Sequence, residues 1–550
     1  MANKSIAHEL AKHQREISVS QFFEKNRHLL GFDNKRKALL TAVKEAVDNS
    51  LDACEEARIL PEINVEIIDL SNDRYRIIIE DNGPGIVKEQ IPKIFAKLLY
   101  GSKFFKLSQS RGQQGIGISA SVLYAQLTTG KPAKITSRIS DMDKAHYYEL
   151  HLDTNTNKPE IVKEDIVDFS REHGTRIELE LEGEYFQGSK SVDAFLKQTA
   201  IANPYSTIIY TNPKSEQLIF SRVVNELPPK PKEIMPHLYG VEIGRMMNML
   251  KFTTSRTLQS FLTTEFSRVG PGTAKEICEN AAILPQTKPI EITREMVEKL
   301  IQGIQKTKLM RPETDCLSPI GKEALEKGIK KEINAEFYAA ITRTPDVYRG
   351  NPFIIEVGLA YGGAQNKEGS IELMRFANRV PLVYQPGACA ITKAVTQVNW
   401  KAYGLNQSNG NLPQGALTVV VHMASVWVPF TSESKEAVAE YPEIIKEIKL
   451  AIQEVGRSLG IYVHKKKRVQ AEGQKRDYIT RYMPHIAEAL GEILGKDNVN
   501  KDKVEKMLAE ILEKHRGELE KVEMENKEYD EEFAKIGKDK EEDGENDSSE

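Results

Sequence analysis

Three prolines fall within the six residues Leu227–Lys232, and this short segment constrains the fold more than any other feature of the sequence. Proline fixes its own backbone and disfavours helix at the preceding residue, so neither a helix nor a central strand can run through the segment. A chain of 550 residues is also too long for one hydrophobic core, because single cores stop growing at roughly 250–300 residues. We therefore expect the chain to divide at this segment.

Before the proline segment, the sequence alternates between helical and strand patterns. Arg36–Ala57 carries apolar residues at helical spacing, and the stretches after it alternate apolar and polar residues, as expected of a sheet covered on one face. The expected strands are Ile63–Leu70, Arg74–Asp81, Ala133–Ile139, His146–Asp153 and Thr175–Glu182.

After the proline segment, a helical stretch interrupted by Gly270-Pro271-Gly272 leads into a second α/β unit and then into charged helical sequence. The second α/β unit has expected strands at Phe353–Tyr361, Glu372–Phe376 and Leu417–Pro429 and expected helices at Ile391–Tyr403 and Ser434–Leu459. The last 22 residues hold ten acidic and three lysine side chains, which is typical of a disordered tail. We predict an α+β multidomain protein with domains at 1–226, 227–305, 306–465, 466–528 and 529–550.

Composition narrows the class of protein. No apolar run approaches the roughly 18 residues that cross a bilayer, and the N-terminus lacks the apolar core of a secretory signal. Four widely spaced cysteines with no C-x-x-C pair argue against a disulfide framework or a zinc site. The net charge is −4 and the tail carries −7, so the rest of the chain is mildly basic at +3, which permits contact with nucleic acid. We expect a cytoplasmic protein that does not bind membranes.

Glu45 and Asn49 lie four residues apart on the first predicted helix, which places both side chains on one face. A carboxylate there can take a proton from an attacking water, and an amide oxygen can bind a Mg²⁺ that bridges phosphates. The same face also carries Asp52, so the alternative is an ordinary solvated helix face.

Two glycine motifs follow this helix. A predicted strand runs into Asp81-Asn82-Gly83-Pro84-Gly85, where an aspartate can accept a hydrogen bond from an exocyclic amine and glycines let the backbone approach a flat ring. Arg111–Ala120 places three glycines before a predicted helix, so its backbone N–H groups can cradle an anion. It is not a Walker A loop, because no Gly-Lys-Ser/Thr follows, and no strand leads into it as in a Rossmann fingerprint. Either motif alone is a weak signal.

A Gly174-Thr175 pair then opens the last predicted strand of the first unit. Chance assembly of four such elements in this order is improbable, and together they predict a Mg·ATP site that hydrolyses the nucleotide. The set resembles the Bergerat fold of the GHKL ATPases, which include type II topoisomerases, ninety-kilodalton heat-shock chaperones, MutL proteins and sensor histidine kinases.

That resemblance implies roles for individual residues. It makes Glu45 the general base, Asn49 the Mg²⁺ ligand and Asp81 the residue that reads adenine, in an α/β sandwich domain that binds ATP and Mg²⁺. The further nucleotide contacts that it implies are Gly83, Gly85, Ser102, Lys103, Gly112, Gln113, Gln114, Gly115, Ile116, Gly117, Ile118, Ser119 and Thr175. For Lys103, an exposed surface position is an equal alternative.

Beyond the first unit, the sequence resembles the B subunits of type IIB topoisomerases. Pro236–Ala281 is similar to a helix-two-turns-helix module, which could contact a DNA phosphate or act only as a spacer. Trp400-Lys401-Ala402-Tyr403 and Pro429–Glu436 match the transducer domain of that family, which implies a long C-terminal helix after it. The resemblance implies that Lys435 touches the γ-phosphate of ATP, the alternative being a surface lysine. It also implies a DNA-facing loop at Trp400, the alternative being a buried tryptophan.

The sequence shows no apparatus for cutting DNA. Its only D-x-D, Asp141-Met142-Asp143, falls in a predicted turn, and no tyrosine has a recognisable cleavage context. The resemblance therefore implies a separate DNA-cleaving A subunit in an A₂B₂ complex, docked at Arg476–Leu494, with Lys465–Arg468 as a plain basic patch or a portion of that site. Two B chains would dimerise on ATP through their N-terminal segments and gate passage of one DNA duplex through another, relaxing supercoils and decatenating. The alternatives are a chaperone-type ATP clamp and a MutL-like repair scaffold.

Overall fold

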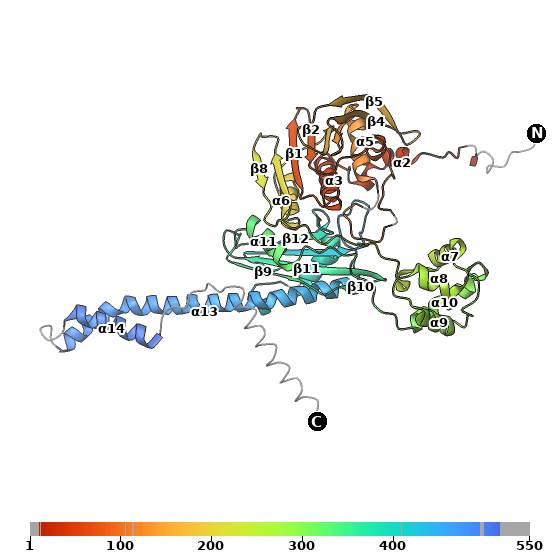
Figure 1. The fold of residues 1–550 in the computed structure, drawn as a ribbon. Helices are drawn as coiled ribbons and strands as arrows, with labels where there is room; N and C mark the ends of the chain where they lie inside the picture. The colour runs from red at the N-terminus through yellow and green to blue at the C-terminus, as the bar shows by residue number, and fades with distance from the viewer. Residues whose placement is uncertain are drawn as a thin grey trace, which may run out of the picture.

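The first predicted helix forms as α3 (Lys35–Glu56) and lies against the sheet of the first unit (Figure 1). The Asn34 side chain caps it by accepting a hydrogen bond from the Lys37 N–H at 2.9 Å, and its apolar stripe is buried in the core. The computed structural model describes residues 10–11, 13–104, 106–112, 115–408, 410–494 and 500–516.

The sheet of the first unit has the strand order β5-β4-β3-β6-β2-β1-β7-β8 over the described residues. The strands are β1 (Glu62–Asp69), β2 (Arg74–Asp81), β3 (Ala133–Arg138), β4 (Ala145–Asp153), β5 (Lys158–Val167), β6 (Gly174–Glu182), β7 (Thr207–Thr211) and β8 (Gln217–Phe220). The β1–β7 pair is parallel and the other neighbours are antiparallel. The five strands predicted from alternation are confirmed to within one residue at each end. β5, β7 and β8 were not predicted.

Helices cover one face of this sheet, and α3, α5 and α6 contribute many of the residues buried in its core (Figure 1). The helices are α2 (Val19–Lys25), α3, α4 (Ile91–Phe95), α5 (Gly117–Thr129) and α6 (Val192–Ala202), with short 3₁₀ turns η1 (Arg27–Leu30) and η2 (Lys88–Gln90). This arrangement confirms the predicted α/β sandwich.

A helical unit with its own core follows the proline segment. Its helices are α7 (Ile243–Phe252), α8 (Leu258–Glu265), α9 (Pro271–Asn280) and α10 (Arg294–Lys306), with 3₁₀ turns η3 (Leu238–Gly240) and η4 (Pro289–Glu291). The predicted interruption at Gly270-Pro271-Gly272 is the break between α8 and α9, where Pro271 occupies the first helical position.

The third unit is a second sheet with helices packed against it. Its strand order is β10-β11-β14-β12-β13, and β9 also pairs with β11. The strands are β9 (Phe337–Thr342), β10 (Asp346–Tyr348), β11 (Asn351–Tyr361), β12 (Glu372–Ala377), β13 (Val380–Pro381) and β14 (Leu417–Ser425). The helices are α11 (Lys322–Glu332), α12 (Ala390–Gln397), α13 (Pro442–Leu494) and α14 (Lys501–Arg516), with 3₁₀ turns η5 (Pro386–Ala388) and η6 (Trp400–Tyr403).

Four predicted bounds in the third unit are wrong. The strand from Leu417 ends at Ser425, and the helix from Ile391 ends at Gln397, where Val398 is extended and the 3₁₀ turn η6 follows. The helix predicted from Ser434 begins only at Pro442, because the residues before it form a loop in which Lys435 has a positive φ of 53°. Its predicted end at Leu459 is also wrong, because the charged helical sequence that follows continues the same helix to Leu494.

α13 packs beneath the second sheet and then extends far beyond it (Figure 1). The helix has 53 residues, and up to about Val463 one of its faces is buried against the sheet. Most of its later residues are exposed, including most of the predicted docking segment from Arg476. Over the described ranges, the helices include none that is long and apolar enough to cross a membrane. The predicted acidic tail, 529–550, lies outside the described residues.

Candidate nucleotide site

A cavity of about 630 Å³ lies beside α3, between the end of β2 and the start of α5. This volume falls within the range of roughly 300–1,000 Å³ that is usual for small-molecule sites. The predicted site residues that line it are Glu45, Asn49, Asp81, Gly85, Ser102, Lys103, Gly112, Gly115, Ile116, Gly117, Ile118, Thr175 and Lys435. Gly83 and Ser119 lie just behind this lining, and Gln113 and Gln114 lie outside the described residues.

Glu45 and Asn49 both face the glycine loop. A β-carbon on Gly117 would overlap Glu45 Oε2, so the Glu45 carboxylate lies directly against the first residue of α5. A β-carbon on Gly112 would lie 3.8 Å from Asn49 Oδ1, which places the amide oxygen at the other end of the same loop. One turn of α3 therefore presents a carboxylate and an amide oxygen to one cavity.

The Glu45 carboxylate lies among lysines. Lys44 Nζ is 3.0 Å from Glu45 Oε1, and Lys435 lines the same cavity. Burial alone would raise the pKa of Glu45, but the positive charges of Lys44 and Lys435 outweigh burial and hold that pKa below its ordinary value. The carboxylate is therefore ionised at neutral pH and can accept a proton.

Asp81 lies at the end of β2, buried at the floor of the cavity. Its Oδ1 accepts hydrogen bonds from the Gly83 N–H at 2.9 Å and the Thr175 N–H at 3.1 Å, and its Oδ2 accepts one from the Ser50 hydroxyl at 2.8 Å. A carboxylate offers about four lone-pair positions, so one remains for a donor in the cavity. Burial raises the pKa of Asp81 and the three hydrogen bonds oppose that rise.

The glycine loop needs glycine where the backbone turns tightly. Gly115 has φ +58°, and a β-carbon there would overlap the Phe104 ring. α5 has no side-chain cap among the described residues, so its first-turn N–H groups can donate to a ligand. This arrangement is an anion cradle beside the Glu45 carboxylate.

The third unit closes one side of the cavity, as the resemblance implied for Lys435. Lys435 Nζ donates to the Arg111 carbonyl oxygen at 2.9 Å, just before the glycine loop, so Lys435 is not an isolated surface lysine. Burial lowers its pKa, although Glu45 and two aspartates of α3 oppose that change. Its neighbour Glu436 contacts Lys37 of α3. Sequence reasoning missed Pro381, Val383, Tyr384, Glu433, Ser434 and Glu436, which also line the cavity.

Lys103 is not a plain surface lysine either. Its Nζ lies 2.7 Å from both Asp52 and Glu56 on α3, and these two carboxylates raise its pKa despite partial burial. Sequence reasoning also missed Ser50, which holds Asp81 in place. The available signal was a polar residue directly after Asn49 on the buried side of α3, where a hydroxyl needs a hydrogen-bond partner.

Other predicted residues lie away from the cavity. Trp400 is fully buried and its Nε1 donates to the Val395 carbonyl oxygen at 2.8 Å, so the buried-tryptophan alternative is confirmed, while Lys401 is exposed. Asp141 and Asp143 lie exposed in the turn after β3, as predicted, and the described residues of the chain contain no cluster of three metal-binding side chains. Arg268 lies beside the glycine turn, and its Nε is 3.6 Å from Glu313 Oε1.

Two family models match the chain. Residues 34–184 match histidine kinase-, DNA gyrase B- and HSP90-like ATPases, and residues 312–475 match the transducer of the topoisomerase VI B subunit. These ranges fall on the first and third units, which together enclose the cavity.

Curated relatives match over nearly the whole chain. The B subunit of type 2 DNA topoisomerase 6 from Methanococcoides burtonii is 52% identical over 493 residues, covering 90% of this chain and 79% of that protein. The corresponding protein of Archaeoglobus fulgidus is 49% identical, covering 89% and 81%. That of Natronomonas pharaonis is 36% identical, covering 92% and 86%. The chain therefore belongs to the family of type 2 DNA topoisomerase 6 B subunits, the ATP-binding and ATP-hydrolysing subunits of type IIB topoisomerases.

Proposed function

We propose that Glu45 is the general base of ATP hydrolysis in this protein. The observation that supports this role most directly is the placement of its carboxylate against Gly117, at the end of the anion cradle. Because Lys44 and Lys435 keep the carboxylate ionised, it can take a proton from a water at the γ-phosphate. Asp81 would bind the exocyclic amine of adenine through its free lone pair, with Gly85 beneath the ring.

Asn49 would hold a Mg²⁺ that bridges the phosphates. The amide oxygen faces the cavity at the start of the glycine loop, and Mg²⁺ binds through one or two protein oxygens together with substrate phosphates and water. The ion would neutralise charge on the phosphates. Ser102, Lys103 and Thr175, which line the same cavity, are proposed as further nucleotide contacts, and residues 112–119 as the phosphate lid.

We further propose the assembly that goes with this activity. The chain would dimerise on ATP through its N-terminal segment, join a DNA-cleaving A subunit at 476–494 in an A₂B₂ complex, and gate passage of duplex DNA. The domain boundaries at 226, 305 and 465 belong to the same proposal. Four buried free thiols, Cys54, Cys278, Cys316 and Cys389, support work in a reducing cytoplasm.

Substitution of Glu45 by Gln tests the proposed base. The variant keeps the shape of the side chain but cannot accept the proton, so ATP should still bind while hydrolysis slows by about 10²–10⁴. Steady-state phosphate release and equilibrium binding of a fluorescent ATP analogue measure the two quantities. Glu66→Gln, the same change at an exposed carboxylate on β1, is the control. Wild-type turnover in Glu45→Gln would remove Glu45 from this role.

A further inference from the structure

The three residues before the glycine loop, Gln109–Arg111, are attached to the third unit one after another. The Gln109 N–H donates to the Cys316 carbonyl oxygen at 3.0 Å, and its side chain exchanges two hydrogen bonds with Ser318. The Ser110 carbonyl oxygen accepts from the Asn378 side chain at 3.0 Å. With the Lys435 bond to Arg111, every residue of this lid stem contacts the third unit.

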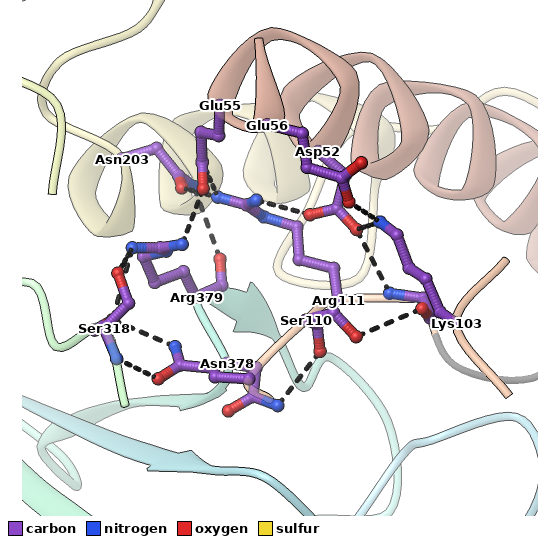
Figure 2. Close-up of polar contacts among 12 residues, drawn as sticks. Asp52, Glu55, Glu56, Lys103, Ser110, Arg111, Asn203, Ser318, Asn378 and Arg379 are labelled. Atoms are coloured by element: carbon purple, nitrogen blue, oxygen red, sulfur yellow. Dashed lines mark hydrogen bonds and ion pairs between the residues drawn. The ribbon is translucent and has the colours of Figure 1, made fainter. Parts of the chain in front are cut away.

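The Arg111 side chain turns the other way, into the first unit (Figure 2). It is only 5% exposed, and its guanidinium donates to Asp52 at 2.7 Å and to Glu55 Oε1 at 2.5 Å. Both acids lie on α3, on the turns that follow Glu45 and Asn49. The lid stem is thereby fixed to the helix that carries the proposed catalytic residues.

Glu55 joins this attachment to the third unit. While its Oε1 accepts from Arg111, its Oε2 accepts from Arg379 Nη2 at 2.6 Å (Figure 2). One carboxylate whose side chain is 13% exposed thus bridges two buried guanidinium groups from different units. Removing Glu55 would take away the carboxylate that pairs with the buried Arg379 guanidinium and would break its link to Arg111, so the attachment depends on this side chain.

Arg379 reaches Glu55 from a tight turn. Ala377 pairs with Val380 across the β12–β13 hairpin, so Asn378 and Arg379 alone form its tip, with positive φ angles of 47° and 66°. Such turns favour glycine and asparagine, and an arginine there is strained. The Arg379 N–H is held by His422 Nε2 at 2.9 Å, and His422 in turn donates from Nδ1 to the fully buried Glu356 at 2.7 Å.

We propose that Arg379 and Glu55 are positioning residues for ATP hydrolysis, which hold the lid stem in register with α3 through Arg111. Neither side chain lines the cavity, so neither touches the nucleotide, unlike Lys435. Their contact sets where Gly112 and Gly115–Gly117 sit relative to Glu45, and it carries any movement of the third unit directly to these glycines. This role rests on the proposed function of Glu45 and the lid.

Kinetics of Arg379→Met give the first test. The variant should lower kcat for ATP hydrolysis by about tenfold and change KM by less than about threefold, because the lid end of the site is misplaced while Asp81 is untouched. Arg379→Lys keeps the positive charge but loses the paired donors of the guanidinium, so its kcat should fall between those of Arg379→Met and the wild type. The control is Arg343→Met, which removes ion pairs to Glu447 and Glu454 within the third unit and should leave kcat unchanged.

A double-mutant cycle then separates positioning from general damage. Glu55→Gln and Arg379→Met should be non-additive, with a double variant no slower than the slower single variant, because each removes the same bridge. Independent, multiplying losses would overturn the proposal, as would wild-type kcat in Arg379→Met. If Arg379→Met does not fold, Arg379→Lys carries the cycle with Glu55→Gln.

Hydrogen exchange gives a readout that needs no hydrolysis. In nucleotide-free chain, the Gln109 amide, which is bonded to Cys316, should exchange about tenfold faster in Arg379→Met than in wild type, and at the wild-type rate in Arg343→Met. Unchanged exchange would overturn the proposal. The two proposals can fail separately. If Arg379→Met speeds exchange at Gln109 while Glu45→Gln hydrolyses ATP at the wild-type rate, the positioning role of Arg379 stands and the assignment of Glu45 as the base is rejected.

Discussion

Glycines make room for close approaches within the proposed site. Gly117 leaves room for the Glu45 carboxylate, and Gly85, with φ +74°, lets the backbone pass the Arg138 carbonyl oxygen closely. In each case a β-carbon would overlap a neighbouring atom. At the scale of single residues, the proposed site is therefore defined as much by missing side chains as by the side chains proposed to be catalytic.

Substitution of Gly117 by Ala tests this directly. The added methyl group would displace the Glu45 carboxylate without touching Asp81, so hydrolysis should fall by about 10²-fold, the effect of misplacing a reacting group by roughly 1 Å. Binding of ATP should change little. Phosphate release and nucleotide titration measure these effects, and Gly272→Ala, at an open position in the helical unit, is the control. Normal turnover in Gly117→Ala would contradict the placement of Glu45.

At the scale of elements, the sequence predicts best where one face is buried. α3 and the five alternating strands follow from periodicity, because burial repeats along them. The sequence does not predict β5, because nearly all of this strand is exposed and its residues show no alternation of apolar and polar side chains. The helix start at Ser434 was wrong because a tertiary contact, Lys435 with Arg111, holds the loop in a conformation that local propensity does not favour.

Contacts between distant segments account for what the sequence could not reveal. Local motifs identify Glu45, Asn49 and Asp81, since each carries a spacing or a neighbour that suggests chemistry. Arg379 has no such signal, because its partner Glu55 lies 324 residues away and the hairpin that aligns them is recognisable only in three dimensions.

A buried histidine, His237, lies just before the first helix of the helical unit α7–α10 and makes the stability of the chain depend on pH. His237 is buried, donates from Nε2 to the Met310 carbonyl oxygen at 3.0 Å and accepts from the Tyr239 N–H, so it is neutral. Burial lowers its pKa, and the Met310 carbonyl only partly opposes this change. The unfolded chain binds a proton below the ordinary pKa of 6.5 and the folded chain does so only at lower pH.

This linkage predicts that stability falls as pH drops below 6.5. The loss should reach up to about 1.4 kcal/mol for each pH unit between 6.5 and the lowered pKa of the folded state. Differential scanning calorimetry at pH 5.5 and 7.5 should show a smaller pH effect in His237→Gln than in wild type. His485→Gln, at an exposed histidine on α13, should behave as wild type. Equal pH effects in wild type and His237→Gln would contradict the assignment.

At the scale of the whole molecule, the first and third units meet around the nucleotide cavity. Lys435, Glu436, Asn378 and Arg379 all contact the first unit. Lys435 and Asn378 bond the lid stem itself, and Arg379 bonds Glu55, which pairs with the Arg111 side chain. A ligand in the cavity would thus touch both units at once, so its loss can alter how they pack.

Lys435→Ala should separate hydrolysis from DNA passage. ATP should still be hydrolysed, within about tenfold of wild type, because Glu45 and the lid remain, but the third unit would no longer respond to the γ-phosphate. With a purified A subunit, decatenation per ATP hydrolysed should drop by at least about tenfold. Lys367→Ala, at an exposed lysine of the third unit, is the control. Full decatenation by Lys435→Ala would contradict this coupling role of Lys435.

α13 starts in the third unit and extends far away from the contacts around the cavity. Its 31 residues beyond Val463 extend about 45 Å at 1.5 Å per residue, while its first turns are packed into the third unit. The helix would therefore act as a lever arm that pivots where it leaves the second sheet, at about Val463 (Figure 1). A tilt of about 10° at this pivot would move its far end by about 8 Å, so a small change in the packing of the third unit would become a large displacement at the end of the helix.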